Sequence, residues 1–286
     1  MKTNYIEVNP RPVEWRELIP ALVKVYTAIH SIISGNLHPL LHFSTFTATV
    51  NAIVGLLAAG GLLYKTVRNY LNSRGESDVL RRFGKLRQKS LCPFARKTKL
   101  FAGEVGNKQN IQSAVVAMLP KLITLTEIGR KRKLDGLVID LPAERFAKNL
   151  RQFSKTFNSL LREIAQNDPT GENCLQGKIL REGWQFTFNH TRFFVTSFAP
   201  FYDPKHPRYS QSTKHAFVYL QPEYSFDNHG ISNHNAHREQ VKENIRKAFQ
   251  NAGSRYDIAL VKQPFEALKY VKPLIESQPP IRWWKS

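Results

Sequence analysis

The distribution of apolar and charged positions divides the chain into an uncharged N-terminal part and a longer part in which strand-like and helix-like stretches alternate. From Val25 to Tyr64 the chain contains no Lys, Arg, Asp or Glu, and Phe43 to Tyr64 is a continuous, largely apolar run. As a helix, this run is long enough to cross the roughly 30 Å of hydrocarbon in a bilayer. The pattern therefore predicts a transmembrane helix within residues 36–64.

The segments on either side of this run differ in charge. Residues 1–35 contain apolar side chains at helical spacing between Trp15 and Ile33, which indicates an amphipathic interfacial helix or one arm of a helical hairpin. Residues 65–88 begin a basic stretch and predict a juxtamembrane linker. Because Lys and Arg accumulate on the cytoplasmic side, we expect a single-pass membrane protein whose C-terminal domain is cytoplasmic. The alternative is that both apolar segments are buried helices of a larger soluble bundle.

Residues 89–286 predict one α+β domain with a largely antiparallel sheet and flanking helices, preceded by the N-terminal apolar helices. Leu137 to Leu141 is a short apolar run before a proline, as in a buried strand. Apolar residues then recur every three or four positions from Ala143 to Ile164, which indicates a long amphipathic helix. The other expected elements are helices over 111–123 and 236–251, strands over 184–188 and 215–221, and a strand over 192–199 that pairs with 184–188 in a hairpin.

Net charge and cysteine content narrow the function classes. The formal charge is +20, which favours an anionic partner such as phosphate, acidic lipid or an anionic ligand. Basic residues concentrate after the apolar run and do not follow an aromatic strand face, so no specific nucleic acid is expected. The two cysteines fit no zinc or redox spacing and favour a reducing compartment.

The segment between two of the predicted strands, Pro200 to Tyr209, has the most distinctive chemistry. It contains three prolines, which restrict the backbone, together with His206 and two cations. A loop restricted in this way can hold an imidazole in one position, as a metal ligand requires. The alternative is a proline-rich surface turn with an ordinary exposed histidine.

An ordered set of short motifs runs through this domain. It comprises Cys92-Pro93-Phe94-Ala95, Trp184 to Phe188, Ala199-Pro200 with His206-Pro207-Arg208-Tyr209, and Leu220 to Phe226. In order and approximate spacing, over about residues 88–286, the set resembles the YqcI/YcgG-like family. Members of that family with known activity include heme-dependent N-hydroxylases that act on arginine or other guanidino compounds. The uncharged N-terminal third has no counterpart in this resemblance.

The resemblance implies heme b as the cofactor and His206 as the axial ligand of its iron. Arg208 and Lys205 are then candidates to pair with the heme propionates, and Arg96 could bind a propionate or a substrate carboxylate. Phe186, Phe188, Phe194, Phe198 and Tyr219 are aromatic residues that could wall the macrocycle or fill the core. Cys92 could ligate iron as a thiolate, but a structural role or a place near the pocket fits the resemblance better.

Two further groups could contact a substrate or a metal. Glu223, at the end of a predicted strand, is a possible partner for a cationic substrate such as a guanidinium or an amine. Asp227, His229, His234 and His237 lie within eleven residues and could bind a metal, although their spacing follows no facial-triad pattern. The stretch from Ser225 to Asn235 reads equally well as a polar loop before a helix.

The sequence therefore leads to two function hypotheses. The first is a membrane-tethered, heme-dependent oxygenase that hydroxylates a nitrogen of a small amino-acid-like or guanidino substrate, using O2 and an external electron donor. The second is a binding protein without catalysis, either a heme sensor or carrier or a basic protein of membrane surfaces or nucleic acids.

Overall fold

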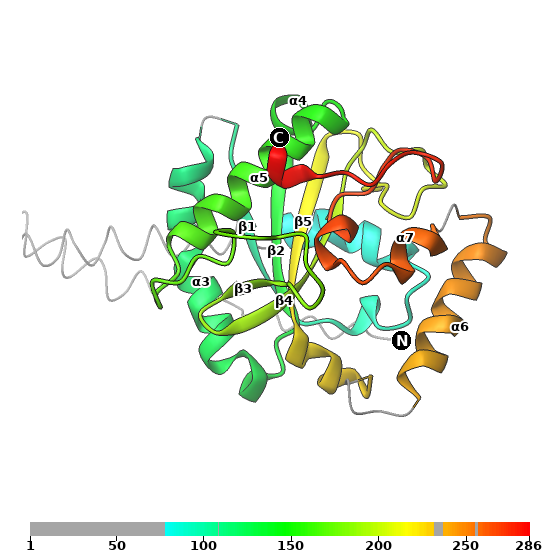
Figure 1. Ribbon diagram of the computed structural model, residues 1–286, viewed down its shortest axis with the longest axis horizontal. Helices are drawn as coiled ribbons and strands as arrows, with labels where there is room; N and C mark the ends of the chain where they lie inside the picture. The colour runs from blue at the N-terminus through cyan, green and yellow to red at the C-terminus, as the bar shows by residue number, and fades with distance from the viewer. Residues whose placement is uncertain (1–77, 108, 232–236, 255–256) are drawn as a thin grey trace, which may run out of the picture. The chain divides into compact units, whose positions relative to one another are not determined.

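The computed structural model describes residues 78–107, 109–231, 237–254 and 257–286. These residues belong to a unit that extends from Gly75 to Ser286 and is built around a five-stranded sheet of order β1-β2-β5-β4-β3 (Figure 1). β1 and β2 are parallel, and the other neighbouring strands are antiparallel. The strands are β1 (Leu100–Glu104), β2 (Gly136–Pro142), β3 (Phe186–Phe188), β4 (Thr191–Phe198) and β5 (His215–Pro222).

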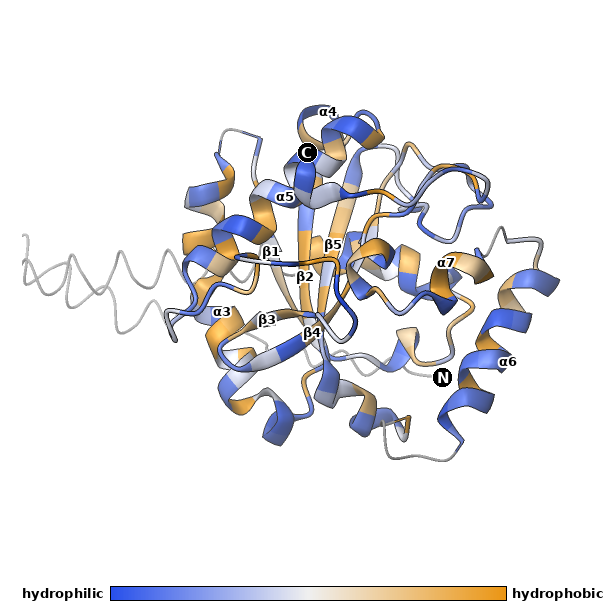
Figure 2. Ribbon diagram, viewed as in Figure 1, coloured by the Kyte–Doolittle hydropathy of each residue, from blue (hydrophilic) through white to orange (hydrophobic). Residues whose placement is uncertain are grey.

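Two long helices, α3 (Ile111–Arg132) and α5 (Leu150–Gln166), cover one face of the sheet. Their apolar stripes pack against alternate residues of the strands and form the main hydrophobic core. α5 has a capped start, because the Asn149 side chain accepts a hydrogen bond from the Gln152 N–H at 2.9 Å. Figure 2 shows the central strands β2 and β5 as largely apolar, as expected for strands covered on both faces.

The opposite face of the sheet is covered by the helical residues 78–89. Val79, Phe83 and Leu86 of this helix are buried at a spacing of three and four, which places them on one side of the helix. They pack against Phe217 of β5 and its neighbours in a second, smaller core. Arg81, Lys85 and Lys89 of the same helix are exposed.

The remaining elements are short or peripheral. The C-terminus lies beside α5, where Asn158 Nδ2 donates to the Ser286 carbonyl at 2.9 Å. The elements are η1 (Ala95–Lys97), α4 (Ala143–Phe146), η2 (Glu223–His229), α6 (Arg238–Asn251), α7 (Ile258–Lys262), η3 (Glu266–Lys269) and η4 (Trp283–Lys285).

The α+β prediction with a mostly antiparallel sheet is confirmed, and β3 and β4 form the expected hairpin. Its two-residue turn, Asn189-His190, has positive φ angles of 47° and 57°, as a turn that matches the strand twist requires. The helix predicted from Ala143 is interrupted at residues 147–149, which separate α4 from α5. The strand β1 was not predicted.

The folded unit begins before the boundary predicted at residue 89, because residues 78–88 of the predicted linker are helical and packed on the sheet. The amphipathic segment 1–35 and the membrane span 36–64 lie outside the described residues, so both stay predictions. Among the residues that the structure describes, α3 has the length and apolar composition of a membrane span. Its buried residues face the core of the domain.

Candidate functional site

A cavity of about 830 Å³ lies on the face of the sheet that carries the helical residues 78–89. Cavities of this volume hold cofactors and drug-sized ligands. Its floor is formed by β4 and β5, where the pleat turns every second side chain away from the main core. Phe194, Thr196 and Phe198 of β4 and Tyr219 and Gln221 of β5 line this floor.

The aromatic residues singled out in the sequence therefore divide between the two faces. Phe194, Phe198 and Tyr219 line the cavity. Phe186 and Phe188 are fully buried in the core beneath α3 and α5. The alternation along the strands predicts that the two sets lie on opposite faces of the sheet. It does not indicate which of the two faces holds a cavity.

The walls come from segments that are distant in the sequence. They include the helical residues 78–89, the segment 90–95 that leads into η1, the loop after β4, and the segment from α7 to Lys272. α6 supplies one wall through Val241, Ile245 and Phe249, spaced one helical turn apart. No residue of α6 is fully buried, and Figure 1 shows this helix at the edge of the fold. Its apolar side is therefore directed at the cavity and not at a packed core.

The charge of the cavity lining is strongly positive. Among the described lining residues, the acidic side chains are Glu223 and Glu266. The basic ones are Arg87, Lys89, Arg192, Lys205, Arg208, Arg238, Lys242, Arg246, Lys269 and Lys272. An apolar floor beside such a lining favours a ligand that combines an apolar body with negative charge.

His206 lies on the loop after β4 with 7% of its surface exposed, and its ring stacks on Tyr202 with centroids 4.3 Å apart. Nδ1 accepts a hydrogen bond from the Arg208 N–H at 3.1 Å, and the ring also bonds to the backbone of Pro273, where the acceptor is the carbonyl. These partners hold a neutral imidazole with its proton on Nε2. Burial, followed by the charges of Lys272 and Arg208, lowers the pKa of His206 to about 3.

Arg208 and Lys205 both line the cavity, but in different environments. Arg208 is buried, its guanidinium lies 5.6 Å from the centroid of the Phe198 ring, and Nη2 donates to the Lys269 carbonyl at 3.2 Å. Lys205 is exposed at the rim. Charge in the buried position is screened much less by solvent than charge at the rim.

Of the other residues singled out in the sequence, Cys92 and Glu223 line the cavity and Arg96 does not. Burial raises the pKa of the Cys92 thiol, which disfavours the thiolate that would ligate iron. Glu223 begins η2 and pairs with Arg192 at 3.8 Å. Arg96 is exposed and donates to the Gln88 carbonyl at 2.8 Å.

Among the residues that the structure describes, the members of the histidine cluster over 227–237 are dispersed. Asp227 pairs with Arg130 at 3.2 Å, His237 precedes α6, and His234 lies outside the described residues. Within the described ranges, no group of three or more His, Cys, Asp or Glu side chains is placed to hold a metal ion.

His229, however, lines the cavity and is held by a buried carboxylate. Its Nε2 lies 3.1 Å from Oδ1 of Asp135, which also accepts from Asn228 Nδ2 and, through Oδ2, from the Lys99 N–H. An ionised carboxylate can only accept, so this pair fixes the proton of a neutral His229 on Nε2 and leaves a lone pair on Nδ1. No local sequence signal predicted this pairing, because the two residues are 94 positions apart.

Comparisons with known proteins give one family match. A model described as the YqcI/YcgG family matches residues 95–259, which is more than half of the chain. The matched stretch includes the loop with His206 and Arg208 as well as Glu223 and His229, and it ends before Lys272. No curated protein and no solved structure matches the chain.

Proposed function

Because the chain belongs to the YqcI/YcgG family, we propose that it is a heme-dependent oxygenase that hydroxylates a nitrogen of a small amino-acid-like or guanidino substrate. The observation that carries the proposal is the cavity of about 830 Å³, which combines an aromatic floor, a cationic lining and two histidines. Heme has a broad apolar ring and two carboxylates, so these residues fit it in size and in charge.

The residues that would hold the cofactor follow from this lining. Phe194, Phe198 and Tyr219 provide an apolar surface that excludes water from the ring. Arg208 at the buried side and Lys205 at the rim can pair with the propionates. When bound there, heme would supply the iron that activates O2. In the reaction an N–H becomes an N–OH, and the second oxygen atom leaves as water after two electrons and two protons arrive from an external donor.

The resemblance implies that His206 is the iron ligand, and this assignment stays a prediction. If His206 held the iron through Nε2, its proton would lie on Nδ1, and the hydrogen bond from the Arg208 N–H would be lost. His229 also lines the cavity, and its lone pair lies on Nδ1, the nitrogen next to Cβ. Variants of both histidines are therefore needed to assign the ligand.

Glu223 supports a cationic substrate. Its carboxylate lines the cavity. Its ion pair with Arg192 is long, at 3.8 Å, so an amine or guanidinium can compete with Arg192 for the carboxylate. Oε1 of Glu266 and Oε1 of Gln185 are further acceptors in the lining, and neither has a hydrogen-bond partner in the described structure. Buried acceptors without partners favour a ligand that donates hydrogen bonds.

Turnover with isotopically labelled oxygen tests this proposal. The heme-loaded full chain, supplied with a flavin reductase and NADPH as electron source, is incubated under 18O2 with a panel of amines and guanidino compounds. We expect a product with one labelled oxygen on nitrogen, and we expect Glu223→Gln to raise KM for a cationic substrate about tenfold or more.

The alternative function predicts a different result. A heme sensor or carrier would bind heme and form no N–OH product from any compound of the panel. That outcome, obtained with protein that binds heme fully, would contradict the oxygenase and leave the binding function.

A further inference from the structure

Two basic side chains that line the cavity are almost completely buried. Arg208 is 8% exposed and Lys272 is 3% exposed, and the charges of both act on His206, which lines the same cavity. The backbone of Lys272 is fixed there, because the Tyr202 hydroxyl donates to its carbonyl at 2.8 Å. Tyr202 also stacks on His206, so the loop after β4 and the segment after η3 are joined at this point.

The charges at this place repel one another. Burial, followed by the charge of Arg208, lowers the pKa of Lys272 to about 7, and Lys269 acts in the same direction. The charges of Asp257 and Glu276 act in the opposite direction and raise the pKa of Lys272. The charge of Asp203 likewise raises the pKa of His206. A buried cation is costly unless an anion compensates it, and two adjacent cations increase that cost. The lining therefore concentrates buried positive charge at Arg208 and Lys272, which favours an anionic group of a ligand there.

We propose that Arg208 and Lys272 form an anion-binding centre that holds a carboxylate or phosphate group of the ligand in the cavity. Arg208 offers a planar fork held over the Phe198 ring, and Lys272 adds a point charge in the same lining. This centre does not require heme. If the proposed function holds, the anion is either a heme propionate or the carboxylate of an amino-acid-like substrate, and these two sources can be separated.

The first experiment uses inorganic phosphate as the probe. Thermal unfolding of the heme-free full chain in detergent is followed at pH 6.5 against phosphate concentration, with KCl at matched ionic strength as the reference. We expect phosphate to raise Tm in a saturable way beyond KCl, and Lys272→Met to abolish this rise. Lys262→Met, the same substitution at an exposed position outside the cavity lining, should retain it.

The fold of the variant is checked in the same experiment. Lys272→Met removes a buried charge and keeps the length of the side chain, so without phosphate it should unfold at the same temperature as the wild type or above it. A phosphate-dependent rise in Tm that is the same in the wild type and in Lys272→Met would overturn the proposal. So would the absence of any specific rise in the wild type.

The second experiment identifies the source of the anion. Hemin is compared with its dimethyl ester, and arginine with agmatine, which lacks the carboxylate. If the propionate is the ligand group, Lys272→Met should weaken hemin about ten- to a hundredfold and leave the ester unchanged. If the substrate carboxylate is the group, the same loss should appear for arginine and not for agmatine. A wild type that binds no hemin would refute the proposed function, while the phosphate result would still decide the anion-binding centre.

Discussion

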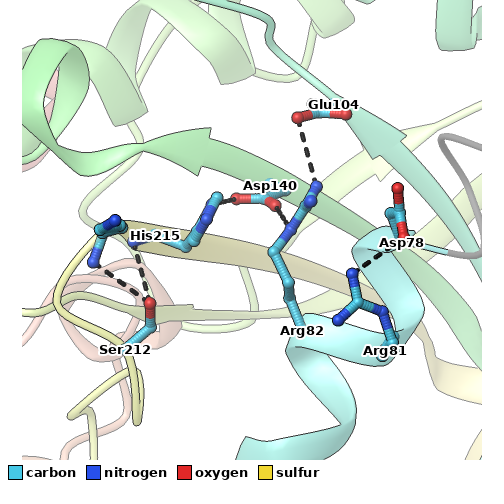
Figure 3. A network of polar contacts seen from close by, with 8 residues as sticks. Asp78, Arg81, Arg82, Glu104, Asp140, Ser212 and His215 are labelled. Carbon is cyan, nitrogen blue, oxygen red and sulfur yellow. Dashed lines mark hydrogen bonds and ion pairs between the residues drawn. The ribbon is translucent and has the colours of Figure 1, made fainter.

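Replacing Asp140 by alanine should lower the free energy of unfolding by about 3 kcal/mol. Asp140 lies on β2 with no exposed surface, and its carboxylate contacts the helix over 78–89 and the neighbouring strand β5. Its carboxylate accepts from Arg82 Nε at 2.6 Å and from His215 Nδ1 at 2.9 Å (Figure 3). Arg82 belongs to the helix over 78–89, which forms one wall of the cavity, so the ion pair attaches this wall to the sheet.

The expected loss of stability follows from the two partners of Asp140, Arg82 and His215, which the substitution leaves without the carboxylate. Burial raises the pKa of Asp140, while the charges of His215 and Arg82 oppose this shift. Without the carboxylate, both partners keep their polar groups beside a buried strand, although 22% and 24% of their side chains are exposed and can be hydrated in part. The loss should therefore lie near the lower end of the range for broken buried pairs.

Glu104→Ala is the matched control for this prediction. Glu104 accepts from the same arginine, Arg82, through Nη2 at 3.2 Å, but its side chain is 39% exposed. Its removal should cost less than about 1 kcal/mol, as for other exposed ion pairs. Urea unfolding of the wild type and both variants measures the difference, and equal losses for Asp140→Ala and Glu104→Ala would show that the buried pair does not hold the helix to the sheet.

Acid should destabilise the heme-free protein through His206. The pKa of this residue is about 3 in the fold and near 6.5 in the unfolded chain, so the unfolded chain binds the additional proton. The stabilisation that His206 contributes is therefore complete above about pH 6.5 and is lost as the pH falls towards 3. Between pH 7 and pH 4.5 the free energy of unfolding should fall by about 2 kcal/mol. The ring is buried, which sustains the effect, but it lies at a cavity, where solvent reduces it.

His206→Asn isolates this contribution. Asparagine offers an oxygen where Nδ1 accepts the Arg208 N–H, but it does not titrate. The variant should lose about 2 kcal/mol less than the wild type between the two pH values, whereas His190→Asn, at an exposed turn, should behave like the wild type. Parallel pH dependences of the wild type and His206→Asn in denaturant unfolding would contradict the assignment.

Local patterns predicted most of the fold, because periodicity reports directly on burial along one element. The helix α5 and the hairpin of β3 and β4 have strong periods of 3.6 and 2 and were predicted. β1 is short and contains Gly103, so it carries little strand signal. The helix over 78–89 was assigned to a linker, because its basic residues dominate the composition while few apolar positions define its buried side.

The site was predictable where the family resemblance named its residues and, for Glu223, from the end of a predicted strand. The resemblance placed His206 and Arg208 on one loop, and both line the cavity. Lys272 carries no motif, and its burial depends on contacts with residues about 70 positions earlier in the chain. The pair of Asp135 and His229 likewise forms only when η2 folds against the start of β2. Such long-range contacts leave no periodic signal in a single sequence.

An absorbance spectrum of the full chain, purified from heme-supplemented cells, tests the central claim most directly. The spectrum is recorded before and after reduction and with CO, for the wild type, His206→Ala and His229→Ala. The account predicts a Soret band in the wild type that shifts with CO, and loss of histidine ligation in the variant that lacks the ligand. A wild type that stays colourless with a full heme supply would contradict it.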